Sequence, residues 1–262
     1  MPHDGDFFGL LKERGYSFGA DVAPGSSLPE GFRPTEGTTI LAVNYDRGVL
    51  IAGDRRATAG NAVIHDRADK VLSIDDHSVL AISGSPAIAY EIARVLEHTF
   101  QYYRRSQLQE LSLEGKLRRV SRLIRENLPM TLQGIGAVIP IFAVYDLSDG
   151  PEGKGKIFFY DALGAQFECA DFATTGSGSP AIRGALYYQN RWSGRPLASM
   201  GLEESVGLVL RLLETAAEYD TATGGTDRRA AIFPTVKTIS REGIRDIPAE
   251  EIARVYGEQV ER

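Results

Sequence analysis

The chain has 262 residues, 43% of them hydrophobic and 24% charged, so it can bury a substantial core and is neither disordered nor fibrous. Its 29 basic and 35 acidic side chains give a net charge of −6, the wrong sign for non-specific binding to nucleic acid or to an anionic membrane surface. The single cysteine, Cys169, excludes an intramolecular disulfide and a thiolate zinc site. The four histidines lack ligand spacing, and we therefore expect neither a metal nor an oxidising compartment.

The first 37 residues differ in composition from the rest, because eleven of them are proline or glycine. This composition predicts turns rather than regular structure. The apolar cluster around Phe7 and Leu11 is interrupted by charged residues on both sides, so it does not form a signal peptide. No other apolar run is long enough to span a membrane.

The body of the chain reads as blocks of strands separated by pairs of helices. In chain order, we expect a hairpin over 38–54, strands at 71–74 and 78–83, helices over about 86–105 and 112–128, strands at 138–147, 156–161 and 166–174, helices at about 179–189 and 202–219, a hairpin of 235–240 and 243–247, and a helix from 248. Helices that arrive in pairs do not suit a doubly wound parallel sheet, in which strands and helices alternate singly. The pattern therefore favours a layered α+β domain built on antiparallel sheets.

Three residues stand out as candidates for catalysis by their type and position. Thr38 lies at the composition boundary, Asp54 closes the second strand of the first hairpin, and Lys70 precedes the next strand; each is sixteen positions after the one before it. The spacing alone is weak support, because an aspartate at a strand end commonly forms a turn and a lysine at a strand edge is commonly solvated. Thr38 as an ordinary strand residue, and Asp54 with Lys70 as a structural ion pair, are the alternatives.

A series of motifs gives these three residues a context: Gly37-Thr38-Thr39-Ile40, Gly53-Asp54-Arg55-Arg56-Ala57-Thr58, Lys70, Ile82-Ser83-Gly84, Gly176-Ser177-Gly178-Ser179 and Asp220-Thr221-Ala222-Thr223-Gly224. In this order they resemble the β-subunits of bacterial, actinobacterial-type 20S proteasomes, which are N-terminal-nucleophile hydrolases. The resemblance implies an α+β fold, a four-layer α-β-β-α sandwich of two antiparallel sheets between helix layers. It also implies a propeptide over 1–37 that is removed on maturation and a catalytic domain over 38–262.

The implied activity is that of a threonine endopeptidase, which degrades unfolded proteins inside a barrel-shaped complex and activates itself by cleavage between Gly37 and Thr38. By resemblance, Thr38 is the nucleophile and its freed α-amine the base, because such an amine titrates at about 7.7 to 8.0. Lys70 would place its ammonium beside the Thr38 hydroxyl, Asp54 would hold that ammonium, and the Gly84 amide would donate to the oxyanion. The positions that support the amine and an ordered water are Ser177, Asp220 and Thr223, the last standing where many relatives carry serine.

The substrate pocket implied by the resemblance is uncharged and predicts a preference for apolar residues before the cut. Its residues are Ala57, Thr58, Ala68, Leu72, Ile82, Pro86 and Tyr90, of which Pro86 is unusual for the family. The implied partners are proteasome α-subunits and other β-subunits in stacked seven-membered rings, a ring ATPase unfoldase and polypeptide substrates, with no nucleic acid, membrane or cofactor. We expect a cytoplasmic location.

Two alternative functions remain at this stage. A non-catalytic ring subunit usually lacks one of the three residues Thr38, Asp54 and Lys70, all of which are present here. A two-ring peptidase of the same superfamily generally has a shorter chain and a shorter segment before the catalytic threonine.

The roles of two local features also remain open between alternatives. The segment Gly176–Ser179 is compatible with a plain helix cap. The basic concentration of Arg104, Arg105, Arg118, Arg119, Arg122 and Arg125 is either a solvated face or a subunit contact.

Overall fold

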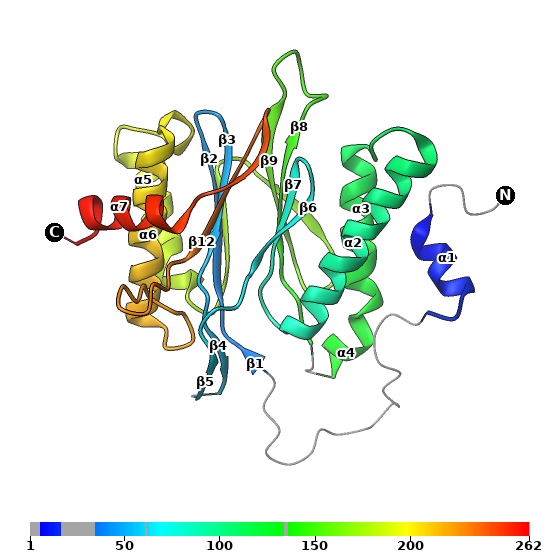
Figure 1. Cartoon of the computed structure of the whole chain (residues 1–262), viewed down its shortest axis with the longest axis horizontal. Helices are drawn as coiled ribbons and strands as arrows, with labels where there is room; N and C mark the ends of the chain where they lie inside the picture. The colour runs from blue at the N-terminus through cyan, green and yellow to red at the C-terminus, as the bar shows by residue number, and fades with distance from the viewer. Residues whose placement is uncertain (1–5, 17–34, 61, 134–135, 262) are drawn as a thin grey trace.

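The computed structural model describes residues 6–16, 35–60, 62–133 and 136–261. Within them the chain forms four layers (Figure 1), with two five-stranded antiparallel sheets packed face to face and helices on both outer sides. Helices α2 (Pro86–Gln107) and α3 (Leu113–Glu126) cover one sheet, and α5 (Ser179–Trp192), α6 (Leu202–Tyr219) and α7 (Ala249–Gln259) cover the other. The expected α-β-β-α sandwich is confirmed.

The sheet that carries the N-terminal hairpin has the strand order β11-β2-β3-β12-β13. Its strands are β11 (Phe172–Gly176), β2 (Thr39–Tyr45), β3 (Gly48–Gly53), β12 (Thr235–Ser240) and β13 (Gly243–Asp246). Successive side chains of β2 point to opposite faces, so Ile40 enters the core between the two sheets and Leu41 enters the core beneath α5 and α6. Because both faces of β2 are buried, its residues 40–43 form a continuous apolar run rather than an alternating one.

The second sheet has the order β10-β9-β8-β7-β6. Its strands are β6 (Val71–Asp75), β7 (Ser78–Ala81), β8 (Ile141–Asp146), β9 (Lys154–Tyr160) and β10 (Gln166–Cys169). The single strand expected over 166–174 is wrong, because β10 pairs with β9 in this sheet whereas β11 pairs with β2 in the other. The two residues between them, Ala170 and Asp171, carry the chain from one layer to the next.

A third, small sheet lies beside the hairpin and was not expected from the sequence. It has the order β1-β4-β5, with β1 (Thr35–Glu36), β4 (Ala57–Ala59) and β5 (Ala62–His65). The chain just before residue 37 is thereby held in an antiparallel pair with β4. The remaining short elements are α4 (Leu128–Leu132) and the 3₁₀ turn η1 (Leu197–Ser199).

A further unexpected element is α1 (Phe7–Glu13), which lies against the outer side of α2 and α3 (Figure 1). Asp6 caps its first turn by accepting a hydrogen bond from the Gly9 amide, and the same carboxylate pairs with Arg119 at 2.9 Å. Phe7 contacts His98 and Tyr102 of α2. The first 37 residues therefore contain regular structure, in contrast to the turns predicted from their composition.

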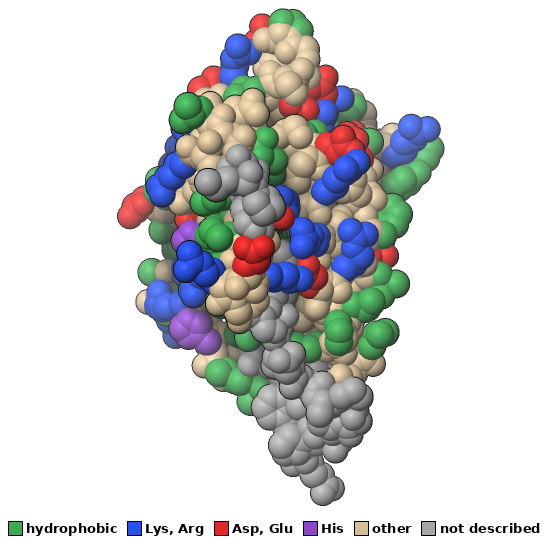
Figure 2. All heavy atoms as spheres, turned by 90° about the vertical axis from the view of Figure 1, so that its right-hand side faces the viewer, with side chains coloured by type: hydrophobic (Ala, Val, Ile, Leu, Met, Phe, Trp, Pro, Cys, Tyr) green, Lys and Arg blue, Asp and Glu red, His purple; other side chains and the backbone are tan. Residues whose placement is uncertain are grey.

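The face formed by these helices carries interspersed acidic and basic side chains (Figure 2). Four arginines of the basic concentration are paired within the chain: Arg104 with Asp76, Arg118 with Glu114, Arg119 with Asp6 and Arg122 with Glu126. Most of the positive charge on this face is thus compensated by the chain's own carboxylates.

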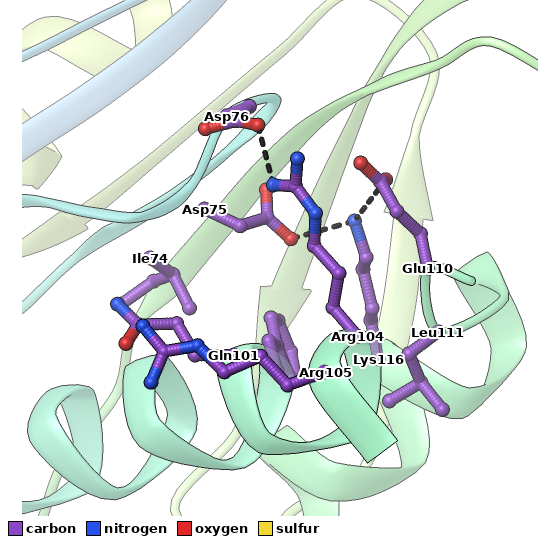
Figure 3. Close-up of a pocket in the computed structure, with 10 residues that line it drawn as sticks. Ile74, Asp75, Asp76, Gln101, Arg104, Arg105, Glu110, Leu111 and Lys116 are labelled. Carbon is purple, nitrogen blue, oxygen red and sulfur yellow. Dashed lines mark hydrogen bonds and ion pairs between the residues drawn. The ribbon is translucent and has the colours of Figure 1, made fainter. Parts of the chain in front are cut away.

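A buried lysine joins this helix layer to the sheet beneath it. Lys116 of α3 is 5% exposed and its ammonium lies 2.7 Å from Asp75, at the end of β6. Figure 3 shows this pair beside a cavity of about 330 Å³, with Glu110 and the Arg104–Asp76 pair nearby. Lys70 precedes β6 at its opposite end, so this cluster is separate from the predicted site by the length of that strand.

Candidate active site

Thr38 lies immediately before the inner strand β2 and is 6% exposed. Two glycines allow the chain to pass close to it. Gly176 has φ +98°, and a Cβ added there would stand 2.0 Å from the Thr38 carbonyl oxygen. Gly37 has φ +99°, and a Cβ there would stand 2.6 Å from both the Ala222 methyl carbon and the Thr58 hydroxyl oxygen. Both positions therefore require glycine for steric reasons.

The register between β2 and β3 brings Asp54 close to Thr38. Ile40 of β2 pairs with Gly53 of β3, so Asp54 follows directly beside Thr39. Its carboxylate is 1% exposed and accepts four hydrogen bonds. The donors are the amides of Thr39 at 2.8 Å, Arg56 at 3.0 Å and Gly224 at 2.8 Å, and the Lys70 ammonium at 2.7 Å.

Lys70 reaches this carboxylate from the start of β6, in the opposite sheet. Its ammonium donates to three acceptors: Asp54, the Arg56 carbonyl at 2.5 Å and the Gly37 carbonyl at 3.2 Å. Burial lowers the pKa of Lys70, and the neighbouring charge of Asp54 opposes that shift by stabilising the ammonium. Lys70 is thus a buried cation with all three ammonium donors hydrogen-bonded, and its third hydrogen bond goes to the carbonyl oxygen of the Gly37–Thr38 peptide bond.

The Gly37 carbonyl oxygen is where the predicted nucleophile and the lysine meet. The Thr38 hydroxyl donates to this oxygen at 2.5 Å, and the Lys70 ammonium donates to it at 3.2 Å. Among the hydrogen bonds of the described residues none joins Lys70 directly to the Thr38 hydroxyl, so the two groups share an acceptor in the uncleaved chain. An ammonium and a hydroxyl at one carbonyl oxygen polarise that carbonyl toward attack at carbon.

A second group of polar side chains lies on the amide side of Thr38. The Thr38 amide points at the Ser177 hydroxyl, 3.4 Å away. Asp220 accepts hydrogen bonds from Ser177 and from Thr223, both at 2.6 Å. The structure therefore brings the sequence-predicted residues Ser177, Asp220 and Thr223 together, with Ser177 beside the nitrogen of residue 38.

Gly84, the predicted oxyanion donor, forms an isolated backbone bridge with Val138. Its φ is +98° and a Cβ there would stand 2.0 Å from the Ala137 carbonyl oxygen, so the position requires glycine. Gly84 lines both cavities described below, and each of them also contains Thr38.

The larger cavity has a volume of about 800 Å³ and is mainly apolar. Five of the predicted pocket residues line it, namely Ala57, Ala68, Ile82, Pro86 and Tyr90. Thr58 instead pairs through its backbone with β1, and Leu72 packs against the core beneath α2 and α3. Pro86 occupies the first turn of α2, where its missing amide costs the helix nothing.

Sequence reasoning did not find several residues of this cavity: Ile64, His65, Arg67, Asp69, Ser85, Ala87, Ile88 and Met130. Strand β5, which supplies Ile64 and His65, and helix α4, which supplies Met130, carry no motif, so only the tertiary fold reveals these residues. Arg67 and Asp69 add charged side chains to the wall. The Arg67 guanidinium donates to the Ala230 carbonyl at 2.8 Å, and the Asp69 carboxylate accepts from the Val71 amide at 3.3 Å. A smaller cavity of about 400 Å³ also contains Thr38, and is lined by Ser83, Ala137, Thr175, Ser177 and neighbouring residues.

Arg56 and Thr39 are two further residues of the site to which the sequence reading gave no role. Arg56 holds Lys70 through its carbonyl and Asp54 through its amide, and its guanidinium donates to the carbonyls of Thr221 and Thr223, both at 3.2 Å. Arg56 stands two residues after Asp54 in a motif already noted, which is the signal that points to it. No group of His, Cys, Asp and Glu suited to a metal ion occurs among the described residues.

A threonine at the start of an inner strand of an α-β-β-α sandwich, beside a buried Lys–Asp pair, defines the N-terminal-nucleophile hydrolase class. Comparison with known sequences makes the assignment more specific. The sequence profile of the proteasome subunit family matches residues 35–232. The chain is 42% identical over 238 residues to proteasome subunit beta 2 of Thermomonospora curvata, covering 89% of this chain and 81% of that protein.

Two other relatives give the same result. The proteasome subunit beta of Acidothermus cellulolyticus is 41% identical, with 92% of this chain and 82% of the relative covered. The proteasome subunit beta of Streptomyces griseus is 37% identical, with 92% of this chain and 84% of that relative covered. The chain therefore belongs to the proteasome subunit family, as the motifs predicted, and is a threonine endopeptidase subunit that assembles with other proteasome subunits in rings. No helix of the described residues has the length and apolar character needed to cross a membrane.

Proposed function

We propose that the chain is made as a precursor whose residues 1–37 are removed by its own Thr38, and that mature Thr38 is the nucleophile of peptide hydrolysis. The observation that carries this proposal is the convergence of the Thr38 hydroxyl and the Lys70 ammonium on the Gly37 carbonyl oxygen. The Lys70–Asp54 pair behind them is buried and so keeps a fixed charge next to the reacting groups.

Self-cleavage follows from this arrangement as an acyl shift. The Thr38 oxygen attacks the Gly37 carbonyl carbon, the hydroxyl proton passes to the nitrogen of residue 38, and the carbon–nitrogen bond breaks to leave an ester and a free amine. Water then opens the ester, giving a Gly37 carboxylate and restoring the Thr38 hydroxyl. While Gly37 is attached the nitrogen is an amide and cannot act as a base, so the leader keeps the enzyme inactive.

Hydrolysis of a substrate reuses the same groups. The freed α-amine, held by Ser177 and Asp220, takes the Thr38 hydroxyl proton as that oxygen attacks the substrate carbonyl, and passes it to the departing amine. Water cleaves the resulting acyl ester. Lys70 stabilises the negative charge that develops on the nucleophile, and the Gly84 amide donates to the oxyanion.

The substrate residue before the cut occupies the apolar cavity beside Thr38. Its largely apolar lining favours aliphatic and aromatic side chains, because an unpaired charge there loses its hydration without compensation. The substrates we propose are unfolded polypeptides, delivered by a ring ATPase into a barrel of β-subunits capped by α-subunits. We place the complex in the cytoplasm, in keeping with the single, unpaired Cys169.

The proposal is tested by the N-terminus of the chain isolated in its assembled complex. Wild type should begin at Thr38, and Thr38→Ala should keep residues 1–37 and hydrolyse no peptide. Intact mass and N-terminal sequencing of both proteins measure this directly. A wild-type N-terminus at another residue, or Thr38→Ala with normal peptidase activity, would show that Thr38 is not the nucleophile and would favour a ring subunit without catalysis.

A further inference from the structure

The residue after the nucleophile, Thr39, is fully buried, and its side chain is not explained by the roles given above. Its hydroxyl lies 2.6 Å from the hydroxyl of Thr223, which is also fully buried. Its amide donates to Asp54 at 2.8 Å. Thr39 is therefore linked both to the Asp54–Lys70 pair and to the group of polar residues around Asp220.

The direction of the hydrogen bonds follows from counting protons. Asp220 is a carboxylate and only accepts, so Thr223, 2.6 Å from it, uses its single hydroxyl proton on Asp220. Thr223 can then only accept from Thr39, which makes Thr39 the donor. Ser177 also donates to Asp220, at 2.6 Å, and faces the Thr38 nitrogen at 3.4 Å. The result is a chain of hydrogen bonds that converges on the Asp220 carboxylate, with the Thr39 hydroxyl at one end and the Ser177 hydroxyl, beside the nitrogen of residue 38, at the other.

The backbone around this chain is built to accommodate the two hydroxyls. A Cβ added at Gly178 would stand 2.3 Å from the Thr39 hydroxyl oxygen and 2.7 Å from that of Thr223. The glycine thus leaves space that the two hydroxyl groups fill, and neither hydroxyl has access to solvent. A buried hydroxyl that loses its partner is costly, so each holds the other in a single orientation.

We infer that Thr39 is a positioning residue, whose hydroxyl orients Thr223 and through it the Asp220–Ser177 pair that holds the catalytic amine of Thr38. This inference rests on the proposed function, because the amine exists only after cleavage at Gly37. It predicts that the Thr39 hydroxyl affects the amine's basicity and alignment while leaving the substrate cavity unchanged, since Thr39 does not line that cavity.

The test compares Thr39→Val and Thr39→Ser, each isolated in the assembled complex and processed to Thr38. Thr39→Val keeps the shape and removes the hydroxyl, and should lower kcat roughly five- to tenfold with KM unchanged. The acid limb of the kcat/KM profile should move to lower pH, because a less well placed Asp220 stabilises the protonated amine less. Thr39→Ser keeps the hydroxyl and should therefore have the wild-type kcat and the wild-type pH profile.

Thr174→Val is the matched control, since Thr174 of β11 is also buried and donates its hydroxyl to a backbone carbonyl of β2, that of Ile40, at 3.1 Å. It should leave kcat and the pH profile at their wild-type values. If Thr39→Val does not fold, Thr39→Ala is measured in the same way. An unshifted pH profile in the hydroxyl-free variant, or failure of both variants to fold while Thr174→Val folds, would overturn the inference and leave Thr39 a structural residue.

The same series separates this inference from the proposed function. If wild type and Thr38→Ala have equal peptidase activity, the assignment of Thr38 as nucleophile fails, and the positioning role of Thr39 fails with it. If wild type is active and depends on Thr38, while Thr39→Val matches it in kcat and pH profile, only the role of Thr39 is refuted.

Discussion

Replacement of Lys70 by alanine separates a catalytic lysine from a structural ion pair. In Lys70→Ala the Asp54 carboxylate stays buried but loses the ammonium that lies 2.7 Å from it. Removing one partner of a buried pair costs about 3 to 5 kcal/mol. Three amide donors, those of Thr39, Arg56 and Gly224, still bind Asp54, so we expect a loss of stability near the lower value, about 3 kcal/mol.

The expected effect on catalysis is larger than this effect on stability. The Lys70 ammonium contacts the Gly37 carbonyl in the uncleaved chain, and we propose that the same charge assists attack on a substrate once the chain is cut. Loss of one preorganised donor of this kind slows a reaction by about 10² to 10³. Leader removal and peptide hydrolysis should therefore fall together in Lys70→Ala.

The fold supplies a matched control in its second buried lysine. Lys116 pairs with Asp75 at 2.7 Å and is as buried as Lys70, but it lies at the far end of β6 (Figure 3). Lys116→Ala should lose a comparable or slightly smaller amount of stability, because Asp75 is 17% exposed. It should nevertheless mature and hydrolyse peptides at wild-type rates.

The assays are intact mass for maturation, thermal unfolding for stability, and hydrolysis of a fluorogenic peptide by the assembled complex. A chain supplied already cut at Thr38 removes the maturation step and tests hydrolysis alone. Near-normal peptidase activity of this pre-cut Lys70→Ala chain would refute a catalytic role for Lys70. A loss of activity in Lys116→Ala as deep as that in Lys70→Ala would instead assign the effect to stability.

Three other predictions follow from single features of the structure. Gly37→Ala should slow removal of residues 1–37 at least tenfold, as followed by mass spectrometry, because the added Cβ would collide with Ala222. The enzyme supplied already cut at Thr38 should be unaffected. Equal rates of removal in Gly37→Ala and wild type would contradict this reasoning. Reporter peptides with Leu or Tyr before the cut should be hydrolysed faster than those with Arg or Asp, and the reverse order would rule out an apolar specificity cavity. Burial raises the pKa of Asp6, but its bonds to the Gly9 amide and Arg119 outweigh burial and lower it overall. The stability that Asp6 gives to the attachment of α1 is therefore complete above pH 3.8, the ordinary pKa of an aspartate, and weakens as pH falls below that value. Hydrogen exchange of the α1 amides at pH 3 and pH 5 will measure this. Equal protection at the two pH values would show that Asp6 does not hold the helix.

The sequence by itself determined the layered α+β class and most of the elements. Apolar runs such as that of β2 and the amphipathic stripes of α2 and α3 are set locally, by which side chains must leave water. The motifs around Thr38, Asp54 and Lys70 also identified the family, because the residue types and their order are specific in combination even where each is weak alone.

Only the tertiary structure decided which layers the strands join and which groups meet. Nothing in the run 166–174 shows that β10 and β11 belong to different sheets, since strand pairing is a contact between residues distant in sequence. The same holds for the site. The pairing of β2 with β3 places Asp54 beside Thr39, and the packing of the two sheets delivers Lys70 to both Asp54 and the Gly37 carbonyl. The hydroxyl pair of Thr39 and Thr223 joins residues 184 positions apart, so its existence depends on the fold and could not be read from the spacing of either motif.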